Sequence, residues 1–186
     1  TEQNYEEALK WYKKAAEQGH ESAQNNLALM YVHGKGTEQN YEEALKWYKK
    51  AAEQGDESAQ NNLALMYDHG KGTEQNYEEA FKWYQTAAEA GHNISKYSVG
   101  NCYFAGNGVE QNYEISIELL IKAAELNSSD AMYTLGLIYL EGQITPQNLD
   151  LGIKYLLEAA KLENFLAEEE LGLMFLYGKH VEADSV

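Results

Sequence analysis

Histidine and its acidic neighbours offer the first candidates for chemistry in this sequence. His33 and His69 lie 36 residues apart, and Asp56 and Asp68 lie near them along the chain. A zinc site requires three or four such side chains arranged around one ion. No cysteine or third histidine completes the set, and two copies of one exposed residue at the end of a helix explain the pair. We therefore expect no metal site.

The remaining reactive side chains also lack the partners that catalysis needs. Cys102 is the only cysteine, which excludes an intramolecular disulfide, and nothing in the sequence marks it as a nucleophile. The segment Gly34-Lys35-Gly36 lacks the preceding strand that a phosphate-binding loop requires. Because an enzyme needs several titratable groups in one pocket, we expect no catalytic residue, no cofactor and no small-molecule substrate.

The interval of 36 residues that separates the two histidines runs through the whole chain. Tyrosines, alanine pairs and glycines return at this spacing without an insertion or a deletion. A fixed period of roughly 20 to 50 residues is typical of stacked repeats, none of which can bury its apolar face alone. We expect a single solenoid of five repeats at residues 1–36, 37–72, 73–108, 109–144 and 145–180, with 181–186 beginning a truncated sixth.

Each repeat has the pattern of two helices. In the first repeat, Asn4 and Glu7 form a capping box, and an apolar stripe with helical spacing follows it. Gly19 then supplies the left-handed residue that commonly ends a helix. A second apolar stripe starts near Glu21 and stops before Gly34. Short links make the two helices antiparallel. The predicted fold class is therefore all-α, an α-α superhelix (solenoid) of five antiparallel helical hairpins.

The charge of the chain limits the classes of partner. The formal net charge is −16, every basic residue is lysine, and the acidity is heaviest from the fourth repeat onward. Nucleic acids and anionic membranes need clustered positive charge, so neither is an expected partner. No apolar run is long enough to span a membrane. A neutral or basic protein is compatible with this surface, and the sequence does not indicate a compartment.

The repeat resembles the Sel-one-like repeat (SLR), a relative of the tetratricopeptide repeat. Its second copy carries the matching residues: Ala44, Trp47-Tyr48, Lys50-Ala51-Ala52, Gly55, Ala59, Leu63-Ala64, Tyr67 and Gly70-Lys71-Gly72. Later copies depart from the pattern, with Asn127 and Glu163 in place of glycine. The resemblance implies an adaptor that holds partner proteins on a curved surface, as in bacterial host interaction and signalling.

A binding groove can be proposed from the same resemblance. By similarity to tetratricopeptide arrays, the second helix of each repeat should line the concave side, and its residues outside the core should contact the partner. The first two repeats are identical at 34 of 36 positions, and Val32 against Asp68 is one of the two differences. The candidate partner-binding residues are Val32, Asp68, Tyr97, Asn101, Phe104, Tyr133, Leu137, Leu140, Glu141, Glu169 and Tyr177.

Two alternatives remain open for this groove. Leu29, Leu137 and Leu173 could instead pack between neighbouring repeats, because solenoid cores are continuous. Tyr97 and Tyr133 are expected to be exposed, because asparagine occupies the same register in the first two repeats. The sequence favours a non-enzymatic protein-interaction scaffold over a structural spacer with active domains elsewhere. A hydrolase ranks last, because the family members once proposed to be β-lactamases carry cysteine pairs that this chain lacks.

Overall fold

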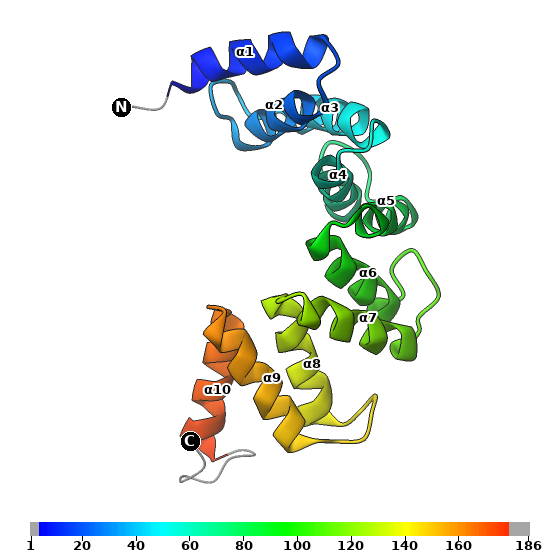
Figure 1. Ribbon diagram of the computed structural model, residues 1–186, viewed down its shortest axis with the longest axis vertical. Helices are drawn as coiled ribbons and strands as arrows, with labels where there is room; N and C mark the ends of the chain where they lie inside the picture. The colour runs from blue at the N-terminus through cyan, green and yellow to red at the C-terminus, as the bar shows by residue number, and fades with distance from the viewer. Residues whose placement is uncertain (1–3, 179–186) are drawn as a thin grey trace. The chain divides into compact units, whose positions relative to one another are not determined.

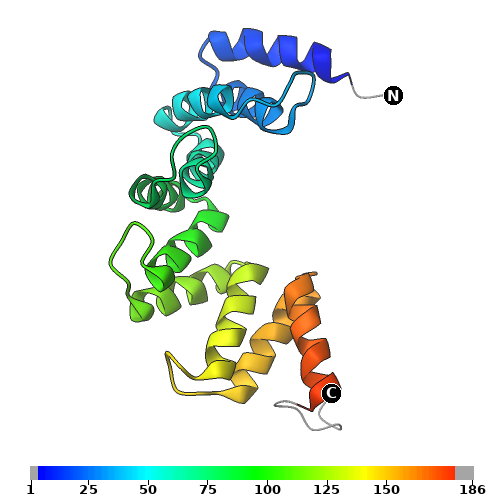
Figure 2. The ribbon, with the colours of Figure 1, turned by 180° about the vertical axis from the view of Figure 1, so that it is seen from behind.

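The computed structural model describes residues 4–178, and these form helices joined by short loops (Figures 1 and 2). The described residues contain ten helices, paired as five hairpins, and no strand, which confirms the all-α fold class. The expected sixth repeat at 181–186 lies outside the described residues. The helices are α1 (Tyr5–Glu17), α2 (Glu21–His33), α3 (Tyr41–Glu53), α4 (Glu57–His69), α5 (Tyr77–Ala90), α6 (Asn93–Ala105), α7 (Tyr113–Glu125), α8 (Ser129–Glu141), α9 (Leu149–Lys161) and α10 (Phe165–Tyr177).

An asparagine caps the first helix of every hairpin. Its side-chain oxygen accepts a hydrogen bond of 3.0 Å from the backbone N–H three residues later, as Asn4 does from Glu7. The capping asparagines are Asn4, Asn40, Asn76, Asn112 and Asn148. In the first three hairpins the glutamate that follows pairs with a lysine one turn on, at 3.3 Å for Glu7 and Lys10. The asparagine therefore satisfies a free N–H at the start of the helix.

The second helices begin at more varied caps. Asp56, Ser128 and Asn164 each accept a hydrogen bond from the backbone N–H three residues on, as their residue types predict. His92 takes the same role through Nδ1, which accepts from the Ser95 N–H at 3.3 Å. His20 makes no side-chain cap bond. These caps therefore share a geometry but not a residue type.

The turn inside each hairpin requires a left-handed residue. Gly19, Gly55 and Gly91 fill this place in the first three hairpins with φ between 93° and 109°. In the last two hairpins Asn127 and Glu163 adopt φ of 62° and 60°. These are the only non-glycine residues with positive φ in the described part of the chain. Asparagine tolerates this conformation, whereas glutamate is strained by it.

The links between hairpins are fixed by a repeated pair of hydrogen bonds. The backbone N–H of each capping asparagine after the first donates to the tyrosine carbonyl near the end of the preceding helix, at 2.9 Å for Asn40 and Tyr31. A glutamine just before the cap donates to the next carbonyl, at 2.6 Å for Gln39 and Val32. Gln75, Gln111 and Gln147 repeat the second bond. These bonds hold each new hairpin against the previous one.

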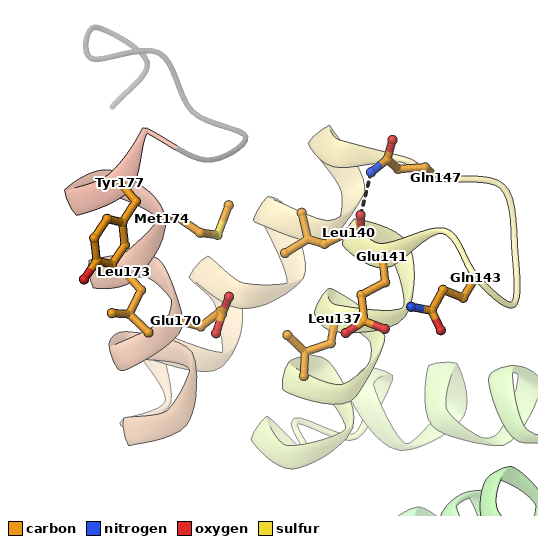
Figure 3. Close-up of a pocket in the computed structure, with 9 residues that line it drawn as sticks. All are labelled: Leu137, Leu140, Glu141, Gln143, Gln147, Glu170, Leu173, Met174 and Tyr177. Atoms are coloured by element: carbon orange, nitrogen blue, oxygen red, sulfur yellow. Dashed lines mark hydrogen bonds between the residues drawn. The ribbon is translucent and has the colours of Figure 1, made fainter.

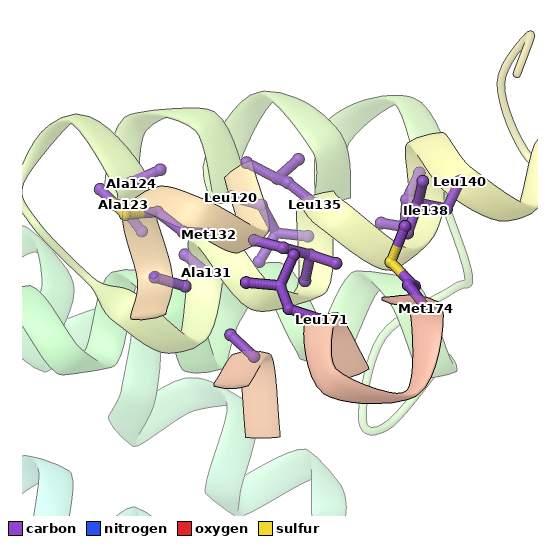
Figure 4. Packing of buried hydrophobic residues seen from close by; sticks show 13 residues of the cluster. Leu120, Ala123, Ala124, Ala131, Met132, Leu135, Ile138, Leu140, Leu171 and Met174 are labelled. Atoms are coloured by element: carbon purple, nitrogen blue, oxygen red, sulfur yellow. The ribbon is translucent and has the colours of Figure 1, made fainter. Parts of the chain in front are cut away.

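The chain divides into two parts by its internal contacts. One part runs through residue 95 and includes 106–110, and the other consists of 96–105 and the residues from 111 onward. In the first part, Ala44, Tyr48 and Leu63 form a buried core with neighbouring alanines. In the second part, α7, α8, α9 and α10 contribute to a larger buried cluster that includes Leu120 and Leu135 (Figure 4). Leu156 also belongs to it.

Small residues allow the helices of successive hairpins to approach closely. A Cβ added at Gly152 of α9 would lie 2.8 Å from the Leu140 side chain and 3.0 Å from the Gly136 carbonyl oxygen of α8. The residues at this position in the preceding hairpins are also small and buried: Ala44, Ala80 and Ser116. Any larger residue would separate the helices, so the position determines how closely the hairpins pack.

The strain at Glu163 predicts a stabilising substitution. Glu163→Gly should raise the free energy of unfolding by about 1 kcal/mol, because the left-handed conformation costs an L-residue roughly 1–2 kcal/mol and the freedom gained in the unfolded chain offsets part of this. Urea unfolding measures the change. Asn127→Gly should give a smaller gain. The account is contradicted if Glu163→Ala, which keeps the strain, stabilises the chain as much as the glycine does.

The buried phenol of Tyr48 predicts a dependence on alkaline pH. Burial raises the pKa of Tyr48 above its usual value of 10.0. The unfolded chain therefore loses this proton near pH 10 while the folded chain retains it, so the free energy of unfolding falls as the pH rises above about 10. Tyr48→Phe should reduce that fall. Urea unfolding of both proteins at about pH 7 and pH 11 checks this, and equal declines in the two proteins would refute it.

Candidate protein-binding surface

The second helices of the last hairpins lie next to one another in the C-terminal part. The capping Asn164 of α10 donates a hydrogen bond of 3.0 Å to Asp130 of α8. Tyr97 of α6 lies close enough to Tyr133 of α8 to influence its ionisation. Residues 36 apart therefore form rows across these helices, for example Tyr97, Tyr133 and Glu169. We call the surface made by α6, α8 and α10 the second-helix face.

A pocket of about 580 Å³ opens on this face between α8 and α10. Three groups of side chains line it: aliphatic residues, two glutamates and two glutamines, with Tyr177 at one end (Figure 3). The full set is Leu137, Leu140, Glu141, Gln143, Gln147, Glu170, Leu173, Met174 and Tyr177. The pocket thus combines an apolar floor with polar groups that could orient a ligand, as binding sites commonly do.

The loop from α8 to α9 forms one side of the pocket. The Gln147 amide donates a hydrogen bond of 2.7 Å to the Leu140 carbonyl, as Figure 3 shows. This is the bond that recurs at every link between hairpins, so the wall of the pocket is part of the repeat architecture. The same bond holds the end of α8, where Glu141 lies. The pocket is therefore supported by fixed backbone on this side.

The charge of the pocket is negative. Glu141 and Glu170 line it and no lysine does. Within residues 4–178 neither glutamate forms an ion pair. Nearby, burial raises the pKa of Tyr133, and the charges of Glu170 and Glu169 contribute to the same shift. The two free carboxylates favour a positively charged group of a ligand.

The structure places the predicted groove residues in different surroundings. Leu137, Glu141 and Tyr177 line the pocket. Leu140 was expected outside the core, and this is wrong: it is 5% exposed, packs against Gly152 and reaches only the pocket floor. Tyr97 and Tyr133 were expected to be exposed, and they are instead half-buried and packed against the core of the C-terminal part.

The row that contains Leu140 has a structural role along the chain. Val32 packs against the core that holds Tyr48. Asp68 accepts a hydrogen bond of 3.2 Å from the Tyr84 hydroxyl. Phe104 meets the Tyr113 ring edge-on, with 5.5 Å between ring centroids. These four residues therefore pack against or bond to other residues of their own part of the chain, which gives the positions a structural role.

The other predicted residues have varied surroundings. Asn101 is half-buried on α6, and Glu169 is exposed on α10. Leu137 and Leu173 were the leucines that could have packed between repeats. Leu137 is half-buried, Leu173 is 42% exposed, and both line the pocket. Leu29 instead packs against the core of the N-terminal part. Leu29 therefore contributes to packing, whereas Leu137 and Leu173 line the pocket.

Glu170 is one of the pocket residues that sequence reasoning missed. It belongs to the run Glu168-Glu169-Glu170, which is usual for a solvated helix face. The sequence did contain a signal for Glu170, namely its position in the repeat. The equivalent residues in the earlier repeats are uncharged: Asn26, Asn62, Ser98 and Thr134. Gln143 and Gln147 were also missed, because they lie in the loop after α8 rather than in the helix.

The residues considered for other chemistry lie apart. His33 and His69 are exposed at the ends of α2 and α4. Among the described residues no group of three His, Cys, Asp or Glu side chains could hold a metal ion. Cys102 is buried. Of the described helices, none has the length and apolar character needed to cross a membrane.

Comparison with known proteins identifies the repeat. The family model described as Sel1 repeat matches the chain six times, at residues 1–20, 21–56, 57–92, 94–128, 129–164 and 166–186. Each full match begins near a second helix, so the family frame is offset from the hairpin frame. No curated protein sequence matches the chain.

Solved structures agree with this family. A Sel1 repeat protein from Oxalobacter formigenes shares 37% identity over 99% of this chain and 74% of its own, with a TM-score of 0.94. A protective antigen from uropathogenic Escherichia coli with an SLR fold shares 35% identity over 99% of this chain and 39% of its own, with a TM-score of 0.87. The resemblance inferred from the repeat motifs is thus confirmed, and the chain belongs to the Sel1 repeat family.

Proposed function

We propose that this chain is a non-enzymatic scaffold that binds a segment of a partner protein in the pocket between α8 and α10. Sel1 repeat proteins are protein-interaction scaffolds, which supports a protein as the partner. The observation that carries the proposal is the pocket itself, which is apolar at its floor and bordered by Glu141 and Glu170. It lies on the second-helix face.

The lining of the pocket defines the partner's chemistry. The apolar lining residues Leu137, Leu173 and Met174 fit an aliphatic or aromatic side chain. The carboxylates of Glu141 and Glu170 fit a lysine or arginine close to it. Tyr177 adds a large, largely exposed ring of the kind that often dominates interface energies. The partner segment should therefore carry an apolar residue beside a basic one.

The remaining members of the predicted groove extend this surface. Tyr97, Tyr133 and Glu169 form a row beside the pocket, and Asn101 lies in the row of Leu137. A longer partner segment would cross these rows from α10 toward α6. The similarity to the E. coli protective antigen supports a place for such binding in the contact between a bacterium and its host.

The proposal predicts both a peptide and the variant that fails to bind it. Selection of a random 12-residue peptide library displayed on phage against the immobilised chain should enrich sequences with a basic residue beside an apolar one. The double variant Glu141→Lys/Glu170→Lys should bind a synthetic copy of the enriched peptide at least about tenfold more weakly, because two attractive contacts become repulsive. Fluorescence anisotropy of the labelled peptide measures the affinity.

A matched charge reversal separates the pocket from overall charge. Glu6→Lys/Glu42→Lys changes the net charge equally at exposed positions of α1 and α3, and it should leave the affinity within about twofold. The proposal fails if both double variants lose affinity alike, or if the pocket variant binds as the wild type does. Enrichment of no peptide at all would favour a spacer over a binding module.

A further inference from the structure

The loop between α6 and α7 contains a reactive pair of residues that the other repeats lack. Asn107 is the only asparagine in the chain that is followed by glycine. The equivalent pairs are Lys35-Gly36 and Lys71-Gly72 in the first two repeats and Gln143-Ile144 in the fourth. The amide carbon of an asparagine can be attacked by the backbone nitrogen of the next residue, and glycine hinders this nitrogen least because it has no Cβ. We therefore expect such a reaction first at Asn107.

The structure leaves the attacking nitrogen of Gly108 available. Within residues 4–178, the Gly108 N–H donates no hydrogen bond to a backbone carbonyl. Asn107 is half-buried, so its side chain is still accessible to water. The nitrogen must lose its proton before it attacks, and no hydrogen bond has to open first. The folded chain therefore does not block the reaction at this pair.

Asn127 shows how the fold protects a comparable pair. It is exposed in the turn between α7 and α8, and serine follows it. The Ser128 N–H, however, donates a hydrogen bond of 3.1 Å to the Ala123 carbonyl. This bond must open before the nitrogen can lose its proton, and local opening has a free-energy cost. The structure thus distinguishes Asn107 from Asn127 by the state of the next N–H.

The packing of the loop requires glycine at position 108. Gly108 has a φ of 72°, which is in the left-handed region. A Cβ added there would collide with the Tyr77 carbonyl at the start of α5. Residues 106–110 belong with Tyr77 to the first part of the chain, so this contact lies inside one part. Because the glycine is fixed by packing, the residue before it decides whether the loop is reactive.

We propose that Asn107 is a site of spontaneous modification, at which the folded chain converts asparagine into a mixture of aspartate and isoaspartate. The Gly108 nitrogen loses its proton to solvent and bonds to Cγ of Asn107. The bond from Cγ to Nδ2 breaks, and the nitrogen takes a proton from solvent and leaves as ammonia. Water then adds to the cyclic imide and breaks either of its two carbonyl–nitrogen bonds. The net reaction consumes water, releases ammonia and replaces an amide by a carboxylate. It is independent of the function proposed above.

Both products change the charge of the loop. In the first repeat the equivalent lysine lies over a tyrosine ring, with 5.5 Å from Lys35 Nζ to the Tyr5 centroid. The modification would place a negative charge at this position instead. Gly108 lines a hollow of about 740 Å³ together with Glu78 and Glu110, so the new carboxylate would lie near other acidic side chains. The modified loop would therefore be more acidic than any of its equivalents.

Isoaspartate also lengthens the main chain. Its backbone runs through Cβ and Cγ, which adds one carbon directly before Gly108. Because Gly108 lies against the Tyr77 carbonyl, the longer loop has to move away from α5. The isoaspartate product should therefore be less stable than a chain with ordinary aspartate at this position.

The proposal is tested by incubating the folded chain at neutral pH beside short synthetic peptides that contain Asn107 or Asn127 with their neighbours. Peptide mapping by mass spectrometry measures the conversion of each asparagine. Asn107 should convert in the folded chain within about threefold of its rate in the peptide, whereas Asn127 should convert at least about tenfold more slowly than in its peptide, because its neighbouring N–H must first be released. Labelling with an isoaspartyl methyltransferase identifies the isoaspartate product.

Asn107→Lys is the matched control, because lysine occupies this position in the first two repeats. It should fold like the wild type and should lose the isoaspartate label. Asn107→Asp carries the new charge on an ordinary backbone, so it should unfold at a higher urea concentration than the aged wild type, which contains isoaspartate. The proposal is overturned if Asn107 stays intact in the folded chain while its peptide converts, or if Asn107→Lys acquires as much isoaspartate as the wild type.

Discussion

The packing of a large side chain over a small one at each junction between hairpins is the contact on which the rest of this structure depends. Leu156 lies over Gly136 and Leu120 over Gly100, so closely that an added Cβ would come within 2.7 Å and 3.2 Å of the leucine side chains. The asparagine caps and the loop glutamines then fix where each new helix begins. Because every hairpin repeats this contact, the fold follows from local rules that need few long-range contacts.

The binding surface is a consequence of the same contact. When α9 packs closely on α8, the next second helix, α10, lies beside α8 and the space between them becomes the pocket. The repeat determines where each side chain lies. Residues that differ from their equivalents in other repeats determine the chemistry of the pocket. Glu141 and Glu170 replace histidine, alanine or uncharged polar residues of the earlier repeats, so this pocket is acidic.

Much of the fold could be predicted because its signals are local. The cap at Asn4, the turn at Gly19 and the left-handed residues that replace glycine at Asn127 and Glu163 can each be recognised from a few neighbouring residues. The site was harder to predict. Val32, Asp68, Phe104 and Leu140 vary between repeats, and variation alone does not distinguish a residue that contacts a partner from one that packs inside its own chain. That distinction depends on which side of the helix faces the next hairpin.

The position of a bound peptide on the chain tests the account most directly. In a titration of the ¹⁵N-labelled chain with a peptide that carries adjacent basic and apolar residues, we expect the largest chemical-shift changes at the end of α8, in the loop that holds Gln147 and along α10 from Glu170 to Tyr177. Shifts that gather on the first helices, or shifts of similar size across all five repeats, would contradict a binding site between α8 and α10.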